Sequence, residues 1–247
     1  MSIKLLHLPS DAEAILVARP NRFVGIVNIL DQKSESVISE SVKVHIHDPG
    51  RLNEILYPGN HVFLKKPNLN SLVIRKTKWD IIAGLVNDQS VLIHSGYHRK
   101  LAEMIFKNKK INPFGTLINI QPEVRFGNSR LDFLLTSGSG EKIFVEIKGC
   151  TLTVNNRALF PDAPSSRATR HLKELMVALK KGYRAAVIVL VFRSDSICFA
   201  PNFETDPNFT KAFTNAVVSG VEVFPLVLSY RNEFIYYEKR IPVCNDY

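Results

Sequence analysis

The sequence predicts an α+β or α/β protein in two parts: a small β-barrel over residues 1–95 and an α/β domain with a mixed central sheet over residues 96–247. Three observations favour this fold class. Short apolar runs alternate with turn residues before residue 95, as in all-β domains. Helical patterns appear only after it, together with a continuous apolar run at Ala185–Phe192, typical of a strand covered on both faces. A chain of 247 residues is also long enough to bury two cores.

The first part contains short apolar runs separated by turn signals such as Asp48-Pro49-Gly50 and Pro58-Gly59. The runs are Ala14–Ala18, Phe23–Leu30, Val42–Ile46, Val62–Leu64, Leu72–Ile74, Ile81–Val86 and Val91–Ile93. Strands of this length and spacing form small barrels or sandwiches. We expect an OB-like barrel that binds nucleic acid.

The second part combines helices with strands. A helical pattern covers Arg99–Asn108, and a second covers about Arg167–Lys181, with Ser165 or Ser166 as its N-cap and Gly182 after its end. The remaining elements are a hairpin of Arg130–Leu135 and Ile143–Ile147, the strand Ala185–Phe192, a helix from Asp206-Pro207 to about Gly220, and the strand Val221–Leu228.

The charge balance indicates a polyanionic partner. Basic residues outnumber acidic ones by 32 to 23, which gives a net charge of +9 and a pI near 9.5. The alternative is a basic surface without a dedicated partner. Candidate phosphate contacts are Arg51, in a tight turn, and Arg75, Lys76 and Lys78, which flank Trp79. Trp79 fits a stacking platform and a core position equally well. We expect nucleic acid, most simply DNA, as the partner.

Three cysteines, Cys150, Cys198 and Cys244, are far apart in the sequence and form no C-x-x-C pair. They predict reduced thiols in a cytoplasmic protein. Asp11 and Glu13 occupy the region where a secretory signal would be apolar, and no apolar run approaches the roughly 20 residues that span a bilayer. The assembly stays open between a monomer and a homodimer.

The predicted hairpin brings together residues that carry chemistry. Side chains alternate along a strand, so Glu146 and Lys148 share one face of Ile143–Lys148. A hairpin centred near Ser139 places Asp132 opposite Glu146. Two neighbouring carboxylates repel each other unless a cation intervenes, and Mg²⁺ or Mn²⁺ prefers such oxygen ligands. The pattern Asp132…Glu146-x-Lys148 is that of PD-(D/E)XK nucleases. The plainer interpretation is a solvent-facing Glu–Lys pair on an edge strand.

Several stretches resemble the sugar fermentation stimulation protein family. They are VHIHDPGRLNEILYPG (Val44–Gly59), SRLDFLL (Ser129–Leu135), FVEIKGCTL (Phe144–Leu152), ALFPDAPSSRATRHLKEL (Ala158–Leu175) and SGVEV (Ser219–Val223). The resemblance implies an N-terminal OB fold, a C-terminal PD-(D/E)XK nuclease-like domain and DNA binding. It also implies catalytic and metal roles for Asp132 and Glu146, and a catalytic role for Lys148. Bacterial relatives are linked to the regulation of sugar-utilisation genes.

Two positions depart from the family pattern. Met104 stands where the family carries the third acid, a glutamate, so Glu103, Glu123 or no residue completes the site. Gly149 replaces the serine common after the lysine. On the following helix, Arg167 and His171 lie one turn apart; we expect Arg167 to contact nucleic acid and His171 to act in catalysis, against the alternative of a solvated helix face.

These observations predict a DNA-binding protein with a Mg²⁺- or Mn²⁺-dependent phosphodiesterase site. The alternative is a non-catalytic DNA-binding transcriptional regulator of sugar metabolism that retains the nuclease fold. A third interpretation, an RNA-binding module, has less support.

Overall fold

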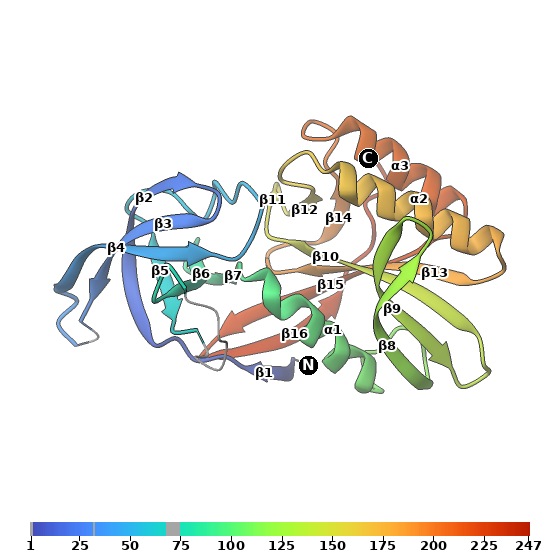
Figure 1. The fold of residues 1–247 in the computed structure, drawn as a ribbon, viewed down its shortest axis with the longest axis horizontal. Helices are drawn as coiled ribbons and strands as arrows, with labels where there is room; N and C mark the ends of the chain where they lie inside the picture. Colours follow the sequence, from blue (N-terminus) through green and yellow to red (C-terminus); the bar gives the residue numbers. More distant parts are fainter. Residues whose placement is uncertain (1, 32, 68–74) are drawn as a thin grey trace. The chain divides into compact units, whose positions relative to one another are not determined.

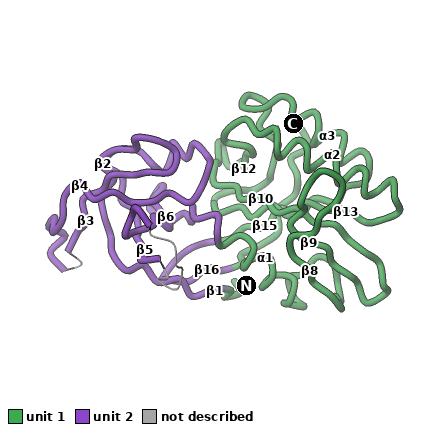
Figure 2. The backbone as a smooth tube through the Cα atoms, viewed as in Figure 1, with its two compact units in different colours: residues 1–5, 97–228, 237–247 green, residues 6–96, 229–236 purple. Residues whose placement is uncertain are grey.

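The computed structural model describes residues 2–31, 33–67 and 75–247 (Figure 1). The chain divides into two compact units (Figure 2). The barrel unit comprises Leu6–Gly96 and Ser229–Tyr236, and the mixed-sheet unit comprises the residues up to Leu5, Tyr97–Leu228 and Tyr237–Tyr247. A C-terminal segment therefore groups with the N-terminal barrel, a long-range arrangement that the sequence pattern does not reveal.

The barrel unit is a six-stranded sheet in the order β4-β3-β2-β5-β6-β7, closed by a parallel pairing of β4 with β6 at His45–Asp80 and Ile46–Ile81. Its strands are β2 (Ala12–Asn21), β3 (Val24–Leu30), β4 (Val37–Ile46), β5 (His61–Lys65), β6 (Asp80–Val86) and β7 (Gln89–Leu92). Alternate residues such as Leu16, Val44 and Leu64 are fully buried. The predicted OB-like barrel is confirmed; the expected run Leu72–Ile74 lies outside the described residues.

The second unit is built on a seven-stranded sheet in the order β1-β16-β15-β13-β10-β9-β8. The strands are β1 (Ile3–His7), β8 (Leu117–Phe126), β9 (Ser129–Ser137), β10 (Lys142–Cys150), β13 (Arg184–Val191), β15 (Glu222–Arg231) and β16 (Phe234–Arg240). Strands β10, β13 and β15 are parallel, whereas β8, β9 and β10 are antiparallel. The sheet is therefore mixed, as predicted.

Three α-helices of the described residues flank this sheet: α1 (His98–Lys107), α2 (Ser166–Lys180) and α3 (Pro207–Val218). A 3₁₀ turn, η1 (Ser95–Tyr97), precedes α1. Figure 1 shows α2 and α3 on one side of the sheet and α1 on the other. The Ser165 side chain caps α2 by accepting a hydrogen bond from Ala168 N–H, and Asp206 caps α3 in the same way through Phe209 N–H.

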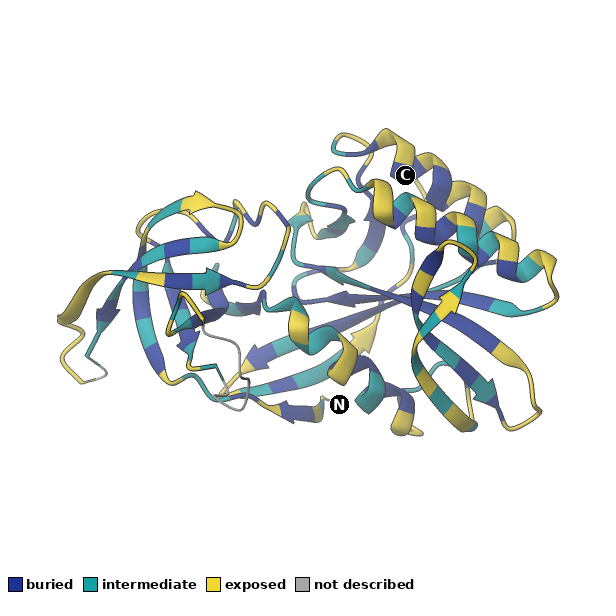
Figure 3. Cartoon of the chain, in the orientation of Figure 1, coloured by how far each residue is buried: buried dark blue, intermediate teal, exposed yellow. Residues whose placement is uncertain are grey.

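The core of this unit lies between the sheet and the pair α2–α3 (Figure 3). Leu172 and Leu175 of α2 pack with Phe144, Val187 and Val189 of the central strands. A small sheet of β11 (Thr153–Val154), β12 (Arg157–Phe160) and β14 (Cys198–Pro201) lies beside it. Burial of the central strands on both faces fixes their register, which in turn fixes the polar side chains that they carry.

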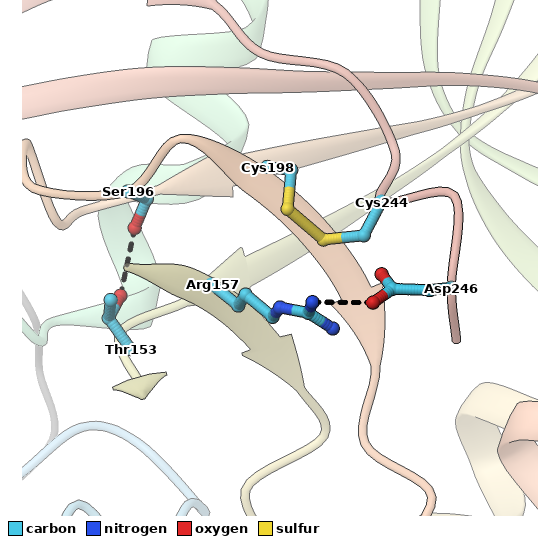
Figure 4. Close-up of a disulfide and its surroundings, with 6 residues drawn as sticks. All are labelled: Thr153, Arg157, Ser196, Cys198, Cys244 and Asp246. Carbon is cyan, nitrogen blue, oxygen red and sulfur yellow. Dashed lines mark hydrogen bonds and ion pairs between the residues drawn. A yellow bond between two sulfur atoms is a disulfide. The ribbon is translucent and has the colours of Figure 1, made fainter. Parts of the chain in front are cut away.

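The expectation of three reduced cysteines is wrong, because Cys198 and Cys244 form a disulfide across 46 residues of sequence (Figure 4). The C-terminal segment runs beside β14: Phe199 N–H donates to Pro242 O at 2.9 Å, and Cys244 N–H donates to Phe199 O at 2.8 Å. This pairing brings the two sulfurs together. The spacing of the cysteines in the sequence does not predict the disulfide. Arg157 and Asp246, 2.6 Å apart, add an ion pair at the same place (Figure 4). Cys150 is buried outside the disulfide, and its thiol donates to Leu159 O at 3.3 Å.

No helix within residues 2–31, 33–67 and 75–247 is long and apolar enough to span a membrane.

Candidate metal centre

The β9–β10 hairpin carries both carboxylates of the predicted site. Its pairs run from Thr136–Lys142 to Phe133–Val145, so Asp132 and Glu146 each stand one residue beyond the last pair. This confirms the register predicted from a hairpin centred near Ser139. The Asp132 carboxylate accepts a hydrogen bond from the backbone N–H of Ile147 at 2.7 Å, which ties it to the neighbouring strand. The hairpin therefore holds both acids at the end of the strand pairing.

Glu146 is only 2% exposed, and its two oxygens have different surroundings. Oε1 accepts hydrogen bonds from Lys148 Nζ at 2.5 Å and from His171 Nδ1. Oε2 is buried and has no hydrogen-bond partner among the described residues. A buried carboxylate oxygen without a partner is costly, so this atom is the strongest indication of a ligand position in the site.

The two carboxyl groups have opposite pKa shifts. Burial alone would raise the pKa of Glu146, but the charge of Lys148 and the hydrogen bond from His171 outweigh it and hold that pKa below its ordinary value. Burial, and then the negative charge of Glu146, raise the pKa of Asp132 to about 6, against the hydrogen bond from Ile147 and the charge of Lys148. The site thus carries one readily ionised carboxylate and one whose burial and negative neighbour outweigh the charge of Lys148.

Helix α2 supplies the donor on the other side of Glu146. His171 is 2% exposed, which excludes a solvated helix face at this position. One turn earlier, Arg167 remains exposed and its Nε lies 3.5 Å from His171 Nε2. Further along α2, the Glu174 carboxylate accepts a hydrogen bond from Asn128 N–H in the β8–β9 turn. The predicted residues Asp132, Glu146, Lys148, His171 and Arg167 therefore form one connected group.

The candidate third acids belong to a different cluster. Glu103 lies 3.1 Å from Arg99, and Glu123 lies 3.5 Å from Arg99 and 3.4 Å from Arg130. Neither glutamate is among the causes of the raised pKa of Asp132, which are led by burial and the charge of Glu146.

Helix α1 explains why Glu103 is not brought to the carboxylates. Its Phe106 packs on Phe133, with ring centroids 5.1 Å apart, and Phe133 pairs with Val145. By strand alternation Val145 and Glu146 point to opposite faces of the sheet. The helix thus covers the face away from Glu146. Met104 lines an open surface depression with Ile3 and Lys107.

His98, the first residue of α1, lies against Gly149 of β10 on the face of the sheet away from Glu146, a contact that the sequence alone does not identify. Its ring stacks on Phe192 with centroids 5.3 Å apart. A Cβ added at Gly149 would stand 2.2 Å from His98 Cε1 and 2.7 Å from its Nε2. A serine side chain at this position would therefore meet the imidazole unless the ring moved. In the sequence, the glycine at position 149 in place of the family's serine was the available sign of this contact, because it indicates that a neighbouring side chain fills the space.

The other predicted contacts belong to the barrel unit. Arg51, Lys76 and Lys78 are exposed. Arg75 is exposed as well, but its guanidinium forms an ion pair with the buried Asp80. Trp79 is partly buried, and Lys66 Nζ lies 5.2 Å from the centroid of its ring. Arg51, Lys76 and Lys78 remain the candidates for phosphate contact in this unit, whereas the Arg75 guanidinium is already paired with Asp80.

Across the part of the chain that the structure describes, no group of three or more His, Cys, Asp or Glu side chains is arranged to hold a metal. The hairpin offers two carboxylates, and the neighbouring histidines His45 and His47, at the end of β4, have no third ligand beside them among the described residues. His47 instead stacks on His94 with ring centroids 4.5 Å apart. Mg²⁺ sites commonly use only one or two carboxylates and complete the octahedron with water and phosphate, so two acids suffice for that ion.

An OB-like barrel joined to a mixed sheet with an acidic hairpin defines a two-part protein of the restriction-endonuclease-like class. Residues 96–234 match the family model described as "Sugar fermentation stimulation protein RE domain", and residues 17–93 match "SfsA N-terminal OB domain". The chain belongs to the sugar fermentation stimulation protein (SfsA) family, as its motifs predicted.

Relatives of similar length support this assignment. The sugar fermentation stimulation protein homolog of Methanococcoides burtonii is 44% identical over 98% of this chain and 96% of its own. That of Thermosipho melanesiensis is 36% identical over 99% of both chains. Among solved structures, Pyrococcus furiosus SfsA in complex with Ca²⁺ superposes with a TM-score of 0.85 at 28% identity, covering 98% of this chain and 99% of that one.

Proposed function

We propose that this protein binds DNA and hydrolyses its phosphodiester bonds at Asp132, Glu146 and Lys148, with Mg²⁺ or Mn²⁺ held by the two carboxylates. The observation that carries the proposal is the buried Oε2 of Glu146, which has no hydrogen-bond partner among the described residues. A divalent cation at this oxygen would satisfy it and offset the repulsion that, together with the larger effect of burial, raises the pKa of Asp132 to about 6.

The donor set fits a hard cation. Carboxylate oxygens are the ligands that Mg²⁺, Mn²⁺ and Ca²⁺ prefer. Lys148 and His171 both donate to Oε1, which leaves Oε2 for a ligand. The similar structure of Pyrococcus furiosus SfsA was determined in complex with Ca²⁺, which supports a cation site in this family.

A bound cation would supply Lewis acidity: it polarises a phosphoryl oxygen and lowers the pKa of a coordinated water. The chain's own residues provide the rest of the chemistry. Lys148 brings a positive charge to the carboxylates and is placed to stabilise charge that develops on a phosphate. Exposed cations of the barrel unit, Arg51, Lys76 and Lys78, would hold the phosphate backbone.

A second candidate function follows from the position of the third acids. Glu103 and Glu123 are engaged with Arg99 and Arg130, so the site has two carboxylates. A two-acid site can bind a cation and a phosphate without cleaving the ester. The alternative is therefore a non-catalytic DNA-binding regulator in which the acidic site organises binding only.

Cleavage assays separate these functions. DNA and RNA, each single- and double-stranded, are incubated with the wild type, Asp132→Ala and Lys148→Ala, in Mn²⁺, Mg²⁺ or EDTA. We expect weak cleavage of DNA by the wild type that needs the cation and that both variants abolish. Metal-free DNA binding should stay equal or tighten in Asp132→Ala, because repulsion of phosphate falls. Absence of cleavage with either cation supports the regulator, and cleavage that survives Asp132→Ala contradicts the site assignment.

A further inference from the structure

Arg167 and His171 form a short chain of contacts that ends at Glu146. Both residues lie on α2, one turn apart, with Arg167 exposed and His171 buried. Arg167 Nε lies 3.5 Å from His171 Nε2, and His171 Nδ1 contacts Glu146 Oε1. An exposed cation therefore reaches a buried carboxylate through both nitrogens of one imidazole.

The chemistry of the two end groups decides where the proton of a neutral His171 resides. A guanidinium has N–H donors and no acceptor, so His171 Nε2 must accept from Arg167. The single proton of the imidazole then resides on Nδ1, where it is donated to Glu146 Oε1. The opposite tautomer would set two donors against each other at Nε2 and two lone pairs against each other at Nδ1.

This arrangement determines how Glu146 is held. Lys148 Nζ donates to the same oxygen, so Oε1 receives two hydrogen bonds. Two donors on one oxygen fix the rotation of the carboxylate and leave Oε2, which is buried and has no hydrogen-bond partner among the described residues. Hydrogen bonds to a metal-binding group typically orient it and change metal affinity by about 10- to 100-fold.

We propose that Arg167 is a positioning residue: it keeps the proton of His171 on Nδ1 and thereby turns Glu146 so that Oε2 alone is left for a divalent cation. This role rests on the proposed function at the same site. It differs from the roles that the sequence suggested, nucleic-acid contact for Arg167 and catalysis for His171.

The tautomer is measured directly on the metal-free protein. Long-range ¹H–¹⁵N correlation spectra identify the neutral ring from the difference between its two nitrogen shifts and then distinguish the two tautomers, and the signals of His171 are those lost in His171→Asn. We expect the Nδ1–H form in the wild type and a shift toward the Nε2–H form in Arg167→Ala. Arg170→Ala is the matched control, because it removes an exposed arginine from the same helix; its spectrum should equal that of the wild type.

Calorimetric titration with Mn²⁺ then tests the consequence. Arg167→Ala should bind Mn²⁺ about tenfold more weakly than the wild type and Arg170→Ala. The amide N–H of His171→Asn can donate to Glu146 without help from Arg167, so adding Arg167→Ala to that variant should cause no further loss.

Three results would overturn the role of Arg167: an Nε2–H tautomer in the wild type, an unchanged tautomer in Arg167→Ala, or equal Mn²⁺ losses for Arg167→Ala in both backgrounds. If no variant binds Mn²⁺, the proposed function fails, and the spectra of the metal-free protein alone decide whether Arg167 sets the tautomer.

Discussion

Asp132 and Glu146 each stand one residue beyond the last β9–β10 pair, and the Asp132 carboxylate accepts the backbone N–H of Ile147, the residue that follows Glu146. The hydrogen bond draws one acid toward the other although their charges repel. Burial and this repulsion together raise the pKa of Asp132 to about 6. The folded protein thus maintains an unfavourable pair of charges, as expected of residues placed for a cation rather than for stability.

The first prediction concerns stability and pH. Because the pKa of Asp132 is raised in the folded state, its stabilising contribution is full below pH 3.8 and is lost as pH rises through about 6. At pH 8 without metal, Asp132→Asn should therefore raise the free energy of unfolding by about 2 kcal/mol, and by much less at pH 4. Denaturant unfolding in EDTA measures this. The control, Asp88→Asn, makes the same change on an exposed turn. A pH-independent effect of Asp132→Asn would contradict the raised pKa.

The second prediction concerns the number of acids in the site. Glu146→Gln should weaken Mn²⁺ binding more than about a hundredfold, because it removes a ligand and not only a supporting contact. Glu103→Gln and Glu123→Gln should leave the affinity unchanged, since both side chains pair with Arg99. Isothermal titration of the three variants measures this. A large loss in either of the latter two would show that a third acid moves into the site when the cation binds.

The third prediction concerns the barrel unit. The logarithm of the DNA affinity should fall linearly with the logarithm of salt concentration, by about 0.9 per phosphate contact. Lys76→Ala and Lys78→Ala should each reduce that slope, because both side chains are exposed. Arg75→Ala should change it less and should lower stability, because Arg75 pairs with buried Asp80. Lys33→Ala, another exposed lysine of the barrel unit, is the control. Identical slopes in all four variants would place the DNA contacts elsewhere.

The fourth prediction concerns Gly149. A side chain at this position meets the His98 ring, so Gly149→Ser should destabilise the protein by about 1–3 kcal/mol. His98→Ala opens the space, and the double variant should recover most of the loss contributed by Gly149→Ser. Thermal or denaturant unfolding of the four proteins gives the coupling energy. Strictly additive effects would mean that the two positions do not share this space.

Local patterns predicted the parts of the fold that depend on neighbours in sequence. Alternation along the strands and the hairpin centre near Ser139 gave the register of β9 and β10, because a hairpin is fixed by its own loop. The cap Ser165 and the glycine after Lys181 bounded α2 to within a residue or two. The same alternation along the hairpin strands predicted that Asp132, Glu146 and Lys148 lie close together.

Features that depend on distant segments were not predicted. The pairing of β1 with β16 and the disulfide between Cys198 and Cys244 join segments that only the folded chain brings together. The unpartnered Oε2 of Glu146 and the ring of His98 beside Gly149 depend on packing between elements. Sequence periodicity carries no information on such contacts. It placed Glu103 near a candidate position but could not show that α1 covers the opposite face of the sheet.

The central claim is that the buried acidic hairpin holds a divalent cation for work on nucleic acid. Anomalous diffraction from crystals grown with Mn²⁺ tests it most directly, because the signal locates the ion without assumptions about activity. We expect one strong peak within coordinating distance of Glu146 Oε2 and of an Asp132 oxygen, and no peak there in Glu146→Gln. Mn²⁺ bound elsewhere with this pair of carboxylates empty, or a peak that persists unchanged in Glu146→Gln, would contradict it.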